Sequence, residues 1–140
     1  MIFQKALRLF NMALIGGVLY LMIELLWRGY THWTMGVVGG VCFIFLGLNG
    51  RLFSSGAPLI IQAVIGTICI TLIELISGII LNIWLGLGIW DYSALPFNFL
   101  GQISVPYILL WLPLSFIAII LYNWLCYWLY NEDRPKFKLI

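Results

Sequence analysis

Long apolar stretches alternate with short polar connections along the 140-residue chain. Four of these stretches come close to the roughly 20 mostly apolar residues that a helix needs to cross a bilayer. They occupy about residues 9–27, 33–49, 58–85 and 105–130. No stretch shows the alternation of a membrane β-strand, and lipid-exposed backbone must satisfy its own hydrogen bonds. The pattern predicts an all-α polytopic membrane protein with four transmembrane helices, built as a single integral membrane domain over residues 1–140.

The composition of the chain supports this prediction. Hydrophobic residues make up 64% of the chain and charged residues only 9%, whereas a soluble domain carries roughly 25% charged residues. Little polar surface is left to face water, so the lipid bilayer is the expected surrounding. The net charge of +2 is too small and too dispersed for a phosphate-binding surface. Nucleic acid is therefore not an expected partner.

Basic residues near the ends of the four stretches indicate an orientation, because cytoplasmic flanks carry an excess of lysine and arginine. On one side of the membrane only Arg28 is basic. The other side holds Lys5, Arg8, Arg51, Arg134, Lys136 and Lys138. The sequence therefore predicts a multi-pass protein of the cell membrane with both termini in the cytoplasm.

Two segments carry nearly the same sequence around an acidic residue: LMIELLWRGYTHW and TLIELISGIILNIW. Glu24, Arg28 and His32 follow one another at intervals of four, so they share a face if the helix continues that far. Asn82 follows Glu74 at the same offset as His32 follows Glu24. This similarity predicts two parallel helical-hairpin repeats, an arrangement that some transporters use.

Glu24 and Glu74 are expected inside the membrane. Each lies roughly 15 residues into its span, which is about 22 Å along a helix with 1.5 Å rise per residue. A carboxylate at that depth costs several kcal/mol unless it faces a partner or water. In a structural interpretation, Glu24 pairs with Arg28, and Glu74 bonds to Ser77 or to a neighbouring helix. In a functional interpretation, both glutamates line a polar site that faces the outer leaflet.

Glycines are concentrated in the second span, GVVGGVCFIFLGLNG. Gly36 and Gly40 stand in GxxxG register, which lets helix backbones approach closely in a membrane. The sequence leaves two uses open for this face: packing within the chain, or the seam of a dimer.

The segment GIWDYSALPFNFLGQIS, residues 88–104, is too apolar for a free loop and too polar for a span. Gly86 and Gly88 are suited to ending the preceding helix, and Asp91 or Ser93 can cap a short helix or an Asx-type turn. Non-helical backbone at that depth must be shielded by protein or line a wet cavity. We therefore expect residues 86–104, the cap segment, to be interfacial or partly re-entrant on the outer side.

Polar and aromatic groups of the cap segment have the same expected depth as the two glutamates. We therefore predict one substrate- or ion-binding site on the outer side. Its expected members are Glu24, Arg28, His32, Glu74, Asn82, Trp90, Asp91, Tyr92, Asn98 and Gln102. The alternative is a structural plug whose polar atoms satisfy the backbone of a broken helix.

Sequence motifs for cofactor chemistry are weak. The only histidine is His32, so a histidine-rich metal site is excluded, and the spacing of the acidic residues is not diagnostic of a divalent ion. The chain contains no GxSxG elbow and no GxxxxGK[ST] loop. We expect no metal, no cofactor and no nucleotide-binding domain in this chain.

Three longer segments resemble a known family: RGYTHWTMGVVGGVCFIFLG, LIELISGIILNIWLGLGIWDYS and LPFNFLGQISVPYILLWLPLS. Together they are similar to the putative ABC-transporter type IV, or CmpB-like, family of small bacterial membrane proteins, over roughly residues 19–130. The resemblance implies a membrane location and a permease label. Because this chain has no ATPase domain, the resemblance also implies a separate ATPase subunit, a partner membrane subunit or a homo-oligomer.

These observations predict a permease-type protein that binds or moves a solute, ion or lipid through an outer-facing polar site. One alternative is a membrane-embedded enzyme acting on lipid-linked or envelope substrates, since two carboxylates in unlike surroundings can share acid–base work. Another is an assembly or sensor subunit without chemistry of its own. We favour a protein that is not an enzyme.

Overall fold

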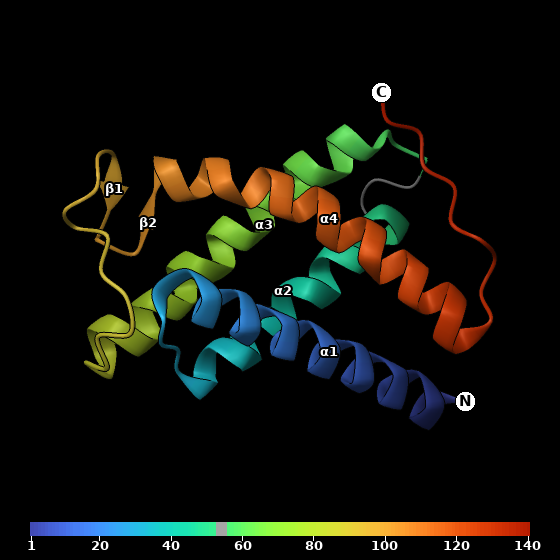
Figure 1. Cartoon of the computed structure of the whole chain (residues 1–140), viewed down its shortest axis with the longest axis horizontal. Coiled ribbons are helices and arrows are strands. Elements are labelled where there is room, and N and C mark those ends of the chain that lie inside the picture. Colours follow the sequence, from blue (N-terminus) through green and yellow to red (C-terminus); the bar gives the residue numbers. More distant parts are fainter. Residues whose placement is uncertain (53–55) are drawn as a thin grey trace. The chain divides into compact units, whose positions relative to one another are not determined.

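The computed structural model of the protein describes residues 1–52 and 56–140, and its principal elements are helices (Figure 1). They are α1 (Ile2–Arg28), α2 (Trp33–Leu52), α3 (Leu59–Gly78), the π-helix η1 (Ile79–Trp84) that continues α3, and α4 (Val105–Tyr130). Each of α1, α2, α3 with η1, and α4 is long and apolar enough to cross a membrane. The all-α, four-span prediction is confirmed, and the protein is a multi-pass membrane protein.

The helix boundaries lie close to the predicted limits except at the end of α2, which continues to Leu52 and not to about residue 49, and at the N-terminus. There α1 begins at Ile2, whereas the predicted span begins near residue 9. Lys5 and Arg8 both lie in this extra part of the helix. An α-helix satisfies its backbone hydrogen bonds in the hydrocarbon and in the headgroup region alike, so it can continue beyond the hydrocarbon. Hydropathy identifies only the apolar part of such a helix.

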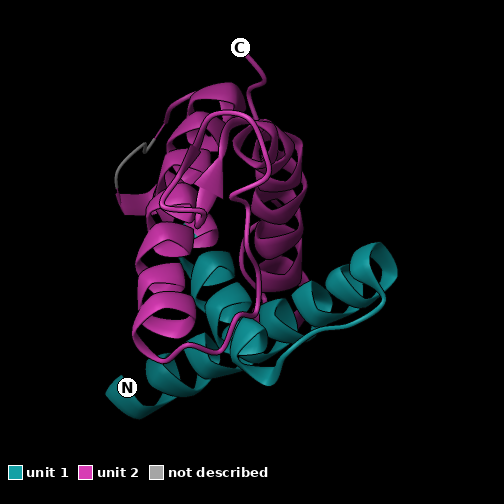
Figure 2. Cartoon of the chain, turned by 90° about the vertical axis from the view of Figure 1, so that its left-hand side faces the viewer, with its two compact units in different colours: residues 1–45 teal, residues 46–140 magenta. Residues whose placement is uncertain are grey.

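The chain forms two compact units, residues 1–45 and residues 46–140 (Figure 2). In the first unit, α1 and the first part of α2 pack through glycine. A Cβ added to Gly40 would lie 2.5 Å from the carbonyl oxygen of Ala13, and one added to Gly17 would lie 2.4 Å from that of Gly36. The glycine face of α2 is therefore used for packing within the chain, which is the first of the two uses that the sequence left open.

In the second unit, α3 and α4 run in opposite directions and pack against each other (Figure 1). The side chains buried in this unit include Ala63, Ile70, Trp111, Ile119, Tyr122 and Cys126. A buried hydroxyl pair, Thr67 and Ser115, joins the two helices at 3.3 Å. This interface positions Glu74 of α3, which lies one heptad after Thr67.

The cap segment forms a short antiparallel hairpin beyond η1. Its strands are β1 (Asn98–Phe99) and β2 (Ile103–Ser104). The connecting turn has positive φ at Leu100 (54°) and Gly101 (68°), and a non-glycine residue rarely adopts that conformation. The Tyr92 N–H donates to the Gly101 carbonyl at 2.7 Å, which holds the first half of the cap segment against the hairpin.

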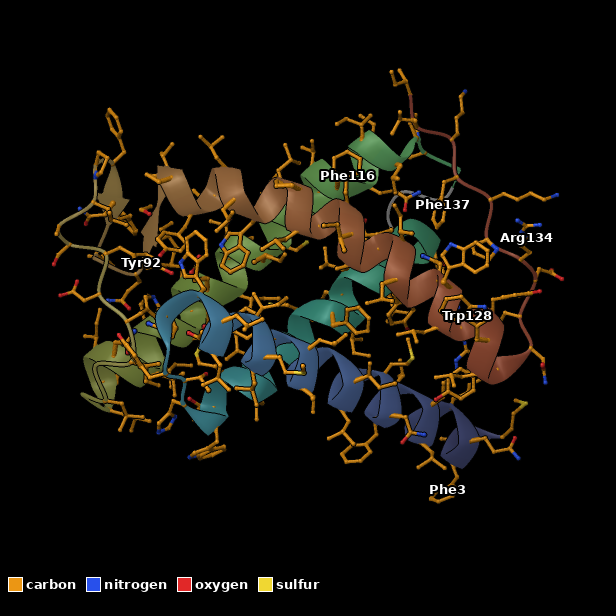
Figure 3. All side chains as sticks on the ribbon, viewed as in Figure 1. Phe3, Tyr92, Phe116, Trp128, Arg134 and Phe137 are labelled. Carbon is orange, nitrogen blue, oxygen red and sulfur yellow. The ribbon has the colours of Figure 1, made fainter. Side chains whose placement is uncertain are left out.

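The opposite end of the second unit carries the C-terminal tail. The N–H groups of Leu59 and Ile60 donate to the carbonyls of Lys138 and Leu139 at 2.6 and 3.3 Å. These contacts satisfy two of the amide groups that a helix N-terminus leaves without an intrahelical partner. Figure 3 shows Tyr92 at the cap end of the unit and Arg134 at the tail end.

Candidate functional site

Glu74 lies on α3 within the second unit, with 8% of its surface exposed. The Tyr92 hydroxyl donates to its Oε1 at 2.9 Å, and the indole N–H of Trp111 donates to its Oε2 at 3.0 Å. The two donors come from the cap segment and from α4. Both carboxylate oxygens are therefore held by neutral groups, and no salt bridge reaches Glu74 among the described residues.

The partner that the sequence suggested within α3 is not used. The Ser77 hydroxyl donates to the backbone carbonyls of Ile73 and Glu74, at 2.6 and 3.2 Å, and not to the carboxylate. A hydroxyl inside a helix commonly bonds back to the preceding turn in this way. The carboxylate instead accepts from Trp111 on the neighbouring helix α4, which is the second partner that the structural interpretation of the sequence offered.

Both donors of Glu74 are aromatic residues, and one of them stacks on a third ring. Tyr92 stacks on Tyr107 with ring centroids 4.4 Å apart and an interplanar angle of 11°. Tyr107 and Trp111 are four residues apart on α4, so they lie on one face of the helix. One donor of Glu74, Tyr92, therefore belongs to a pair of stacked rings contributed by the cap segment and α4. Figure 3 labels Tyr92 at this end of the unit.

A second polar cluster forms where α3 changes to the π-helix η1. The Asn82 side chain donates to Gln102 Oε1 at 2.8 Å and accepts from the Ile89 N–H at 2.7 Å. The Trp90 indole donates to the Gln102 carbonyl at 3.0 Å. Gly78 leaves room for Gln102, because a Cβ there would lie 2.5 Å from its Oε1. π-Helical turns are frequent at functional sites, and this one places Asn82 against the cap segment.

Asp91 and Asn98 serve the internal structure of the cap segment. Asp91 Oδ1 accepts from the Ser93 N–H at 2.9 Å, which is the Asx-type turn that the sequence predicted. Hydrogen bonds from the Ser93 backbone and hydroxyl lower the pKa of Asp91, which is fully exposed. Asn98 donates to the carbonyls of Ser93 and Leu95 at 3.2 and 2.9 Å.

Glu24 has a different environment in the first unit. It forms an ion pair with Arg28 one turn later on α1, and its other oxygen accepts from the Thr31 hydroxyl at 2.8 Å. The Arg28 guanidinium also lies over the Tyr30 ring, 4.8 Å from the centroid. A cation from the chain itself therefore balances the Glu24 carboxylate, as the structural interpretation expects.

His32 does not continue the helical face of Glu24 and Arg28. The helix ends at Arg28, because Gly29 adopts φ +78° and its N–H bonds back to the Leu25 carbonyl. Beyond this left-handed C-cap the chain no longer follows the helical period. The His32 Nδ1 is hydrogen-bonded to the Thr34 hydroxyl at 2.7 Å instead.

The structure thus groups the predicted residues into separate hydrogen-bonded sets. Glu74 and Tyr92 form one, Asn82, Trp90 and Gln102 a second, and Glu24 and Arg28 a third. Asp91 and Asn98 remain within the cap segment, and His32 bonds to Thr34. Among the described residues, no three His, Cys, Asp or Glu side chains are placed to hold a metal ion.

Sequence reasoning missed Trp111 and Tyr107. Two signals could have identified them. Tryptophan usually marks the membrane interface, whereas Trp111 lies more than a turn and a half into α4 and is 9% exposed. Its spacing of four from Tyr107 also places both aromatic residues on one helical face.

The fold and the buried polar groups define a multi-pass α-helical membrane protein with an acidic group inside its third span. The chain belongs to the family described as putative ABC-transporter type IV, which matches residues 18–139. The resemblance noted in the sequence is confirmed. No match was found among curated proteins or among solved structures.

Proposed function

We propose that this protein is the membrane-embedded subunit of a transport system, and that Glu74 takes up and releases a cation, a proton included, during transport. The observation that carries the proposal is the pair of neutral donors on a buried carboxylate inside a span. Ionisable groups in membrane spans usually pair with an opposite charge or mark an ion pathway. Glu24 has its positive partner in Arg28, whereas both partners of Glu74 are uncharged.

The two donors connect the state of Glu74 to the packing of the cap segment. An ionised carboxylate accepts hydrogen bonds at both oxygens, whereas a protonated one also carries an O–H donor. A proton or another cation bound to Glu74 therefore competes with the hydrogen bonds that the Tyr92 hydroxyl and the Trp111 N–H donate to its oxygens. Tyr92 belongs to the cap segment, so loading weakens the contact between this segment and α3.

The basic residues on the flanks support an orientation with cytoplasmic termini, which places the cap segment and Glu74 in the outer half of the membrane. The family supports transport that uses a separate ATPase subunit. Four spans enclose little interior, so we propose that a homo-oligomer of this chain, which purified protein can form, completes the pathway. Downhill movement at Glu74 does not require the ATPase, and the protein alone is sufficient to test it.

The test uses proteoliposomes that contain a pH-sensitive dye and an imposed pH gradient. Wild-type protein is expected to dissipate the gradient faster than empty liposomes, and Glu74→Gln to act like empty liposomes. Glu132→Gln is the matched control, because Glu132 is a partly exposed carboxylate paired with Arg51 at the tail end. Equal rates for wild type and Glu74→Gln, or no rate above empty liposomes for wild type, would refute the proposal.

A further inference from the structure

We propose that Glu74 and the rings of Tyr92, Tyr107 and Trp111 form a binding site for a monovalent organic cation, such as an ammonium with apolar substituents. This inference rests on the proposed function and names the chemical class of the species that Glu74 binds. The carboxylate supplies the opposite charge. The three rings supply the π faces and apolar surface that such a cation needs.

The comparison between the two glutamates indicates why a cation from outside the chain belongs at Glu74. Both residues are 8% exposed. The Glu24 carboxylate is balanced by Arg28 and also accepts from Thr31. Among the described residues the Glu74 carboxylate accepts from a phenol and an indole and from no cation. A charge buried without a counter-charge is costly in a low-dielectric interior. An arriving cation removes that cost.

The surroundings of Glu74 favour an organic cation over a metal ion. Magnesium takes six oxygen ligands and calcium six to eight, and in proteins carboxylates are usually among them. No group of three His, Cys, Asp or Glu side chains suited to a metal is found in the part of the chain that the structure describes. The donors to Glu74 are instead aromatic residues, whose rings suit a weakly hydrated cation that loses little on leaving water.

The geometry also indicates how the cation enters. Tyr107 and Trp111 are fixed on α4, whereas Tyr92 is carried by non-helical backbone in the cap segment. The stack of Tyr92 on Tyr107 and its bond to Glu74 close this side of the carboxylate. A bound cation takes the place of the Tyr92 hydroxyl at Oε1, while Trp111 retains its bond to Oε2.

The test is equilibrium binding of tetraphenylphosphonium to the full chain in nanodiscs, with empty nanodiscs subtracted. Tetraphenylborate has the same shape with the opposite charge and serves as the ligand control. We expect saturable binding of the cation and none of the anion. Glu74→Gln, which removes the carboxylate charge, should lose about tenfold or more in affinity. Glu132→Gln should bind like wild type.

A pair of Tyr107 variants keeps the proposal testable if Glu74→Gln does not fold. Tyr107→Phe retains the ring and should bind within about twofold of wild type, whereas Tyr107→Leu should bind several-fold more weakly because the π face is lost. Saturable tetraphenylborate binding, equal affinity for Glu74→Gln and wild type, or equal affinity for the two Tyr107 variants would overturn the proposal.

The two proposals fail separately. A Glu74-dependent decay of the pH gradient without saturable tetraphenylphosphonium binding overturns the organic-cation site and supports the transport role. Binding that depends on Glu74 without Glu74-dependent decay supports the site and overturns the transport role.

Discussion

The indole N–H of Trp111 donates to Oε2 of Glu74 at 3.0 Å, which ties an acidic side chain of α3 to α4 within their packed interface. Both residues are at most 9% exposed. A buried acceptor that loses its donor keeps the full cost of desolvation. The bond therefore contributes to stability and also fixes the orientation of the carboxylate.

Replacing Trp111 with phenylalanine should lower the free energy of unfolding by about 1–3 kcal/mol, because Glu74 Oε2 loses its donor while most of the apolar area remains. Equilibrium unfolding in mixed micelles measures the change. Trp128→Phe is the matched control, since Trp128 is 61% exposed and should give a much smaller change. Equal losses for the two variants would show that the bond to Glu74 contributes nothing specific.

Replacing Tyr92 with phenylalanine should loosen the cap segment. The ring can still stack on Tyr107, but the bond to Glu74 Oε1 is lost. We expect faster hydrogen exchange in residues 91–101 and faster labelling of a cysteine placed at Ser93 by a membrane-impermeant maleimide. Tyr107→Phe is the control, because the Tyr107 hydroxyl has no hydrogen bond among the described residues. If both variants exchange at the wild-type rate, the Tyr92 hydroxyl does not hold the cap segment.

The spans could be predicted from the sequence because membrane helices depend on local composition over about 20 residues. The last span illustrates this: α4 has the predicted limits, Val105–Tyr130, although Pro113 lies inside it. The start of α1 was harder to predict, because hydropathy does not detect the part of the helix that contains Lys5 and Arg8.

The candidate site could be predicted only in part. The acidic position Glu74 and its partner Tyr92 stand out because polar groups are rare in such a chain. Trp111 was missed, because the sequence of an apolar helix does not indicate which group accepts the hydrogen bond of its indole N–H. The π-helix at Ile79–Trp84 and the left-handed Gly29 that separates His32 from Arg28 depend on backbone geometry, which the apolar pattern does not specify.

Acidification should weaken the turn that begins at Asp91. The hydrogen bonds from Ser93 lower the pKa of Asp91 in the folded protein, so their contribution is complete above the ordinary aspartate pKa of about 3.9. It is lost as the pH falls through the lowered pKa. Asp91→Asn should remove this pH dependence, because the amide oxygen still accepts from the Ser93 N–H. The chemical shift of the Ser93 amide, followed against pH in nanodiscs, measures this dependence in wild type and in Asp91→Asn. If the shift titrates equally in both proteins, another group causes the effect.

Alanine substitutions at two α2 glycines should differ in their cost to stability, because one glycine contacts backbone and the other contacts a flexible side chain. A Cβ at Gly40 would lie 2.5 Å from the Ala13 carbonyl oxygen, and backbone cannot move aside without separating α1 from α2. A Cβ at Gly36 would lie 3.0 Å from the end of the Leu21 side chain, which can rotate. Gly40→Ala should therefore cost about 1–3 kcal/mol of unfolding free energy, as overpacking typically does, and Gly36→Ala clearly less. Equilibrium unfolding of both variants in the same micelles checks the order, and an equal or reversed order would show that the packing of α1 on α2 does not depend on backbone approach at Gly40.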